Sequence, residues 1–206
     1  MSYDKELLQG FVNAIGGHGV TGVKRLAVTS CEAPGAPPHN IHAFYRLFGT
    51  DERREADGLF VITTGLGLQP LGSAVEHSLS RFELFTWVDT LELAGSDVLV
   101  GLSALGRLLH AQATPDSAPW FLGHTLSFAP GDGLGGWDSF LFARHGRSVE
   151  TSVGPVDLAR VMPLTPAERQ RTREQETMLD GAALVVELEN RDYRGTLARW
   201  HTPPAR

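Results

Sequence analysis

The amino-acid sequence predicts an α+β domain in which a mixed, mostly antiparallel sheet of six to eight strands is covered by a few helices. Short segments rich in β-branched and aromatic residues follow one another, and helical patterns stand at the start, middle and end. This grouping differs from the regular strand–helix alternation of a doubly wound sheet. The 206 residues fit a single domain, 1–206, which buries about 70% of its unfolded surface.

Two helices are predicted in the first half of the chain from apolar residues at helical spacing. The first ends at Gly16-Gly17, and the second begins after Ser96, a suitable N-cap. The apolar face of the first is made of Leu7, Leu8, Phe11, Val12 and Ile15, and that of the second of Val98, Leu99, Leu102, Leu105, Leu108 and Leu109.

A third helix is predicted to start at Thr165, where Pro166 suits the first helical position and Glu168 completes a capping box. Residues 182–189 fit either a short helix or an alternating strand.

Eight segments are predicted as strands because they are short, apolar and bounded by turn residues. They are residues 23–28, 41–48, 60–66, 81–88, 125–128, 139–143, 149–152 and 156–162. Both faces of 81–88 carry apolar groups, which predicts a central strand. Residues 49–58, GTDERREADG, are predicted as a charged, turn-rich connection.

Composition limits the partners and the compartment. The net charge is −6 with scattered basic residues, which disfavours nucleic acid and anionic membranes as partners. Cys31 is the one cysteine, the N-terminus has no apolar signal region, and no apolar run approaches the ~20 residues that span a bilayer. We expect a cytoplasmic protein without an internal disulfide. The sequence leaves its oligomeric state open.

Few residues of the sequence suggest catalysis or metal binding. His39 and His42 form an H-x-x-H pair that could supply half of a metal site, although a spacing of three does not place both on one strand face. Cys31 lacks a helix N-terminus that would activate it as a nucleophile. Ser103 lies within a predicted helix rather than on a nucleophile elbow. No spacing pairs the carboxylates Glu76, Glu83 and Glu92 for acid–base work. We expect no cofactor.

The glycine-rich segment 131–136, GDGLGG, leads into a strand rather than a helix, so a connecting loop is favoured over a phosphate cradle. Trp137 beside it is interpreted either as an exposed contact anchor or as a buried residue next to a hairpin loop. On the first interpretation Asp132, Trp137 and Asp138 form a partner-binding site.

Several segments, in order, resemble the suppressor-of-fused domain family. They are VITTGLGLQP at 61–70, RFELFTWV at 81–88, the following helix LVGLSALGRLLHAQ, PWFLGHTLSFAPGDGL at 119–134, and VDLARVMPLTPAERQRTREQETMLDGAALV at 156–185. The resemblance covers roughly residues 60–190 and is weaker in the first fifty-odd residues.

The resemblance implies a non-enzymatic α/β sandwich that binds another protein, with residues 182–189 as a helix. Short bacterial members of this family look like immunity proteins that neutralise toxins by binding them. An acidic antidote suits a basic toxin, because opposite charges speed encounter. The alternative function is a metal-dependent hydrolase with a site assembled from His39, His42 and a distant carboxylate.

Overall fold

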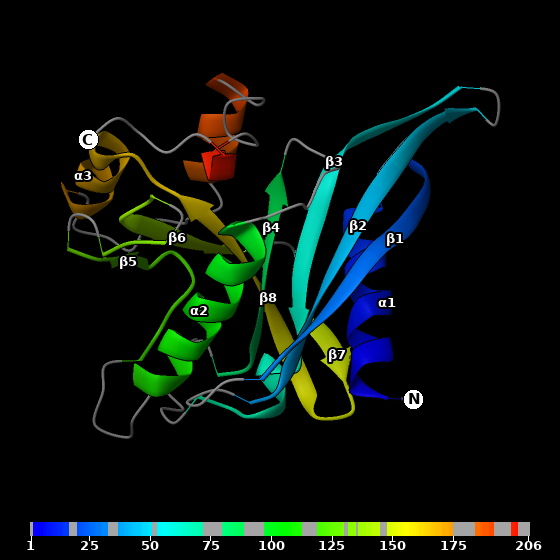
Figure 1. Cartoon of the computed structure of the whole chain (residues 1–206), viewed down its shortest axis with the longest axis horizontal. Helices are drawn as coiled ribbons and strands as arrows, with labels where there is room; N and C mark the ends of the chain where they lie inside the picture. Colours follow the sequence, from blue (N-terminus) through cyan, green and yellow to red (C-terminus); the bar gives the residue numbers. More distant parts are fainter. Residues whose placement is uncertain are drawn as a thin grey trace.

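The computed structural model describes most of the chain and shows one mixed sheet with helices on both faces (Figure 1). The described residues are 2–16, 20–32, 37–50, 53–71, 80–88, 97–112, 119–129, 132–134, 136–144, 148–174, 184–191 and 199–201. The predicted α+β class is confirmed.

The strands of the sheet are ordered β1-β2-β3-β4-β8-β6-β5, and β7 pairs with β8. Their bounds are β1 Val20–Cys31, β2 His39–Thr50, β3 Arg53–Thr64, β4 Phe82–Val88, β5 Thr125–Ser127, β6 Ser139–Arg144, β7 Val149–Thr151 and β8 Gly154–Pro163. The β4–β8 pair is parallel, and every other pair is antiparallel. The predicted central strand is confirmed, because β4 lies between β3 and β8.

The alternation of side chains divides the core between the two faces of the sheet. On β2, Ile41 and Ala43 belong to a buried cluster with Leu102 and Leu105 of helix α2, Asp97–Gln112. Phe44, on the opposite face, packs with Phe11 of helix α1, Tyr3–Ile15. The two helices therefore cover opposite faces.

The C-terminal part carries helix α3, Pro166–Glu174, and a further helix over residues 184–191. The predicted capping box is confirmed: the Thr165 N–H donates to Glu168 Oε2 at 2.9 Å, and the Glu168 N–H donates to Thr165 Oγ1 at 3.3 Å. Residues 184–191 are helical, as the resemblance implies. Short 3-10 turns occupy η1, Leu66–Leu68, and η2, Arg199–His201.

The predicted connection at residues 49–58 is wrong. β2 and β3 are each 12 residues long, and their pairing continues through Gly49↔Arg54 to Thr50↔Arg53. Ladder hydrogen bonds satisfy the backbone whatever the side chains are, so a charged composition does not by itself produce a turn.

Within the described ranges, no helix combines the length and the apolar character that crossing a membrane requires.

A groove between the first helix and the first two strands

Helix α1 forms one wall of the candidate site because it is amphipathic. Tyr3, Leu7, Phe11 and Ile15 are buried on the sheet, where α1 packs chiefly against β3 and β7. The flank of α1 that faces β1 and β2 carries polar residues and partly buried apolar ones, and a groove lies beside it.

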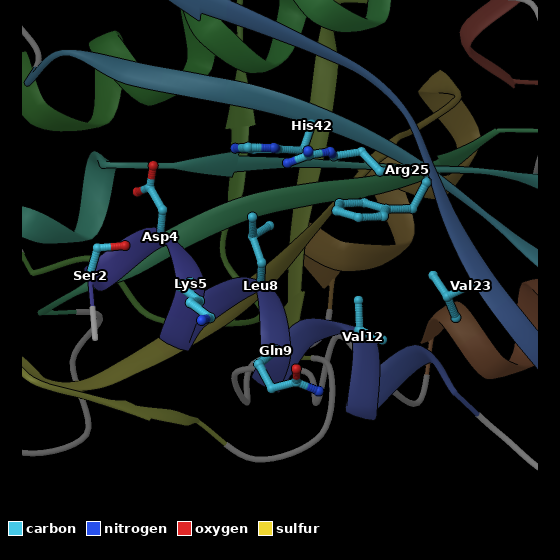
Figure 2. Close-up of a pocket in the computed structure, with 10 residues that line it drawn as sticks. Ser2, Asp4, Lys5, Leu8, Gln9, Val12, Val23, Arg25 and His42 are labelled. Carbon is cyan, nitrogen blue, oxygen red and sulfur yellow. The ribbon is translucent and has the colours of Figure 1, made fainter.

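The groove has a volume of about 470 Å³ and is open to solvent. Its floor is the face of β1 and β2 on the α1 side (Figure 2). It is lined by Ser2, Asp4, Lys5, Leu8, Gln9, Val12, Val23, Arg25, His42 and Phe44. It therefore combines charged groups with an apolar surface, as ligand-binding clefts do.

His42 is the most buried polar residue of the floor, at 4% exposed. Its Nε2 lies 3.0 Å from Thr64 Oγ1, and its ring stacks on Phe44 at 6.2 Å between centroids. Its Nδ1 has no hydrogen-bond partner among the described residues. Burial lowers the pKa of His42, with Asp4 acting against that shift and Arg25 adding to it. One nitrogen of this buried ring is therefore left without a hydrogen-bond partner among the described residues.

Three charged side chains, Asp4, Lys5 and Arg25, line the groove together with His42. Asp4 Oδ2 accepts a 3.4 Å hydrogen bond from Asn40 Nδ2. Arg25 pairs in register with Phe44, so it shares the face of the groove. Figure 2 shows the Arg25 side chain extending from β1 toward His42. In the described part of the chain, neither Lys5 nor Arg25 forms an ion pair.

The floor continues beyond the groove along β1. Val28 pairs with His42 and so lies on the same face, where it is 47% exposed. Leu26, at the bulge between Arg25 and Ala27, is 49% exposed. β1 lies at one edge of the sheet and pairs with β2. Apolar side chains and an edge-strand backbone are therefore available beside the groove.

A buried carboxylate fixes the position of α1. Glu83 on β4 is fully buried, and its Oε1 accepts hydrogen bonds from the Tyr3 hydroxyl at 2.6 Å and from the N–H groups of Gly65 and Gly67. Its Oε2 lies 2.6 Å from the Thr63 hydroxyl. Burial raises the pKa of Glu83, whereas these four hydrogen bonds act in the opposite direction. The network attaches the start of α1, and with it the wall of the groove, to the sheet.

The structure does not bring His39 and His42 together. His39 lies on the α2 side of β2, where its Nε2 is 3.1 Å from Ser103 Oγ and its Nδ1 is 3.0 Å from the Pro37 carbonyl oxygen. Ser103 is within α2, as predicted. Across the described residues, no group of three or more His, Cys, Asp or Glu side chains is arranged to hold a metal ion. The hydrolase hypothesis assumed a metal site shared by His39 and His42, and the two histidines lie on opposite faces of the sheet.

The interpretation of Trp137 as an exposed anchor is wrong. Trp137 is 2% exposed, and its Nε1–H donates to the Arg199 carbonyl oxygen at 2.7 Å. Two backbone hydrogen bonds between Leu134 and Trp137 close a tight turn, and the indole lies in the cluster on the α2 side. Asp132 is exposed and Asp138 is half-buried, so their role in partner binding stays a prediction.

Of the other residues considered from the sequence, Cys31 is not among the residues that line the groove. Cys31 is the last residue of β1 and is partly buried. Glu76 and Glu92 lie outside the described residues. Sequence reasoning missed Asp4, Lys5 and Arg25. The polar flank of the first predicted helix was the available signal for Asp4 and Lys5, whereas Arg25 lies on β1 and had no such signal.

The chain matches no protein-family model, no curated protein and no solved structure. The resemblance to the suppressor-of-fused family therefore stays a prediction.

Proposed function

We propose that this chain is a non-enzymatic protein-binding domain, and that its partner docks on the groove and on the adjoining open face of β1. The observation that carries the proposal is the incomplete cover of the sheet by α1. Val28 and Leu26 are about half exposed next to a groove that contains an unpartnered nitrogen of a buried histidine.

The shape of this surface favours a protein over a small metabolite. The groove is open, and it runs into exposed apolar side chains on an edge strand. Edge strands and apolar grooves are two of the surfaces on which partner segments recurrently dock. Burying Val28 and Leu26 against a partner would add apolar contact area that a ligand confined to the groove could not reach.

The partner proposed is a toxin that this chain neutralises in the cytoplasm. Two observations support it: the resemblance to short bacterial suppressor-of-fused proteins, and the net charge of −6, which favours fast encounter with a basic partner.

The proposal is tested with three forms of the tagged protein produced in its own cells: wild type, Val28→Asp and Val100→Asp. Val100 on α2 is 66% exposed and provides a matched control away from the groove. We expect wild type and Val100→Asp to co-purify the same stoichiometric partner, and Val28→Asp to lose it. Equal recovery by all three forms would place the partner elsewhere and contradict the proposal.

A further inference from the structure

We propose that the groove receives a carboxylate side chain of the partner, with Nδ1–H of His42 and the Arg25 guanidinium as its donors and the apolar lining against the neighbouring partner residue. This inference rests on the proposed function and adds the chemistry of the segment that is recognised.

The first argument is the unused nitrogen of His42. The side chain is 4% exposed, yet Nδ1 has no partner within the described structure. Buried polar atoms are nearly always hydrogen-bonded, so an unpartnered one beside a cleft calls for an explanation, and a ligand atom supplies it. When the Thr64 hydroxyl donates to Nε2, the ring proton lies on Nδ1. In this tautomer the Nδ1–H group of His42 requires a hydrogen-bond acceptor.

The second argument is the charge around that nitrogen. Lys5 and Arg25 line the groove with one carboxylate, Asp4, and neither cation has an ion-pair partner among the described residues. Asp4 is hydrogen-bonded to Asn40 instead. An acceptor that also carries a negative charge satisfies His42 and Arg25 together, and a guanidinium matches the geometry of a carboxylate.

The third argument is the rest of the lining. Leu8, Val12, Val23 and Phe44 give the groove an apolar wall and floor. The volume of about 470 Å³ falls within the ~300–1,000 Å³ typical of sites that hold a compact ligand. An acidic residue next to an apolar one therefore uses both parts of the groove.

The test uses two blocked tripeptides as probes, acetyl-Leu-Glu-Leu-amide and its neutral counterpart acetyl-Leu-Gln-Leu-amide. The NMR signals of the His42 ring nitrogens are followed during each titration of the whole chain. We expect the glutamate peptide to shift the Nδ1 signal saturably and to bind with a Kd about tenfold lower than that of the glutamine peptide, the ratio that one charge-assisted hydrogen bond supplies.

Two variants test whether Arg25 is the cation that gives the preference for the glutamate peptide. Arg25→Gln should abolish the preference for glutamate, while Lys24→Gln should keep it. Lys24 is the neighbouring cation on β1, but it pairs with Tyr45 and so points to the opposite face. Equal binding of the two peptides, no binding of either, or the same preference in Arg25→Gln would overturn the inference. Hexanoate binding as tightly as the glutamate peptide would also overturn it, in favour of a small acid.

The affinity of the captured partner separates this inference from the proposed function. Loss of the partner in Val28→Asp with full affinity in Arg25→Gln would refute the carboxylate and leave the docking surface intact.

Discussion

Replacing Tyr3 with phenylalanine should weaken the attachment of α1 to the sheet. Tyr3 is 8% exposed, and its hydroxyl donates to the fully buried Glu83. Burial, followed by the nearby Glu83 carboxylate, raises the pKa of the Tyr3 phenol, so the hydroxyl stays protonated and remains a donor. Phenylalanine keeps the ring and removes only the hydroxyl, so the substitution isolates one hydrogen bond.

The expected loss follows from the geometry. The 2.6 Å separation is typical of a hydroxyl bound to an ionised carboxylate, and such a bond contributes about 1.5–3 kcal/mol. The N–H groups of Gly65 and Gly67 still donate to the same oxygen at 2.8 and 2.9 Å, which favours the lower part of that range. We expect the free energy of unfolding to fall by about 2 kcal/mol, equivalent to a loss of roughly 4–8 °C in Tm.

Thermal and urea denaturation of wild type, Tyr3→Phe and Tyr45→Phe measure this loss. Tyr45 is half-buried on β2, has no hydroxyl hydrogen bond within the described structure, and is expected to change stability by less than about 0.5 kcal/mol. If Tyr3→Phe were no less stable than Tyr45→Phe, the role of the Tyr3–Glu83 bond in holding α1 would be refuted.

Two further predictions concern pH and the C-terminal region. Burial lowers the pKa of His42, His110 and His124. Below the ordinary histidine pKa of ~6.5 the unfolded chain therefore binds more protons than the folded chain. The free energy of unfolding then decreases as the pH is lowered, by at most about 1.4 kcal/mol per histidine per pH unit. Denaturation from pH 7.5 to 5.5 should show that fall and a shallower slope for His42→Gln; an unchanged slope would contradict the burial of His42. Glu168 closes the capping box and accepts hydrogen bonds from Arg199 at 2.6 and 2.8 Å. Glu168→Gln should therefore lower the free energy of unfolding by about 1–3 kcal/mol. Glu187 forms exposed ion pairs with Arg171 and Arg191, so Glu187→Gln should lower it by less than about 1 kcal/mol. Urea denaturation compares the two variants. Glutamine can still complete the capping box, so equal costs would contradict a stabilising role of the Glu168–Arg199 ion pair.

Local patterns were sufficient to predict most of the sheet and its class. The alternation in residues 81–88 identifies a strand with two buried faces, and β4 is central. The sequence around Thr165 and Glu168 contains both partners of the cap within one turn, so it could be predicted in detail. Residues 49–58 were misassigned because their pairing depends on β2, whose contribution is not visible in a local window.

The groove could not be derived in the same way, because it depends on contacts between distant residues. Glu83 is buried among donors that include Tyr3, 80 positions away in the chain. His42 was selected from the sequence, but for a metal site with His39, which the sheet places on its other face. The part of the sheet that α1 leaves uncovered is decided by the whole strand order.

Photo-crosslinking inside the producing cell tests the proposed docking surface most directly. A photoreactive phenylalanine analogue is introduced at position 28 on β1 or at position 100 on α2, both exposed valines in the native chain. The account predicts a single crosslinked partner from position 28 and none from position 100. Crosslinking of the same partner from position 100 alone would contradict the assignment of the groove and of β1 as the binding surface.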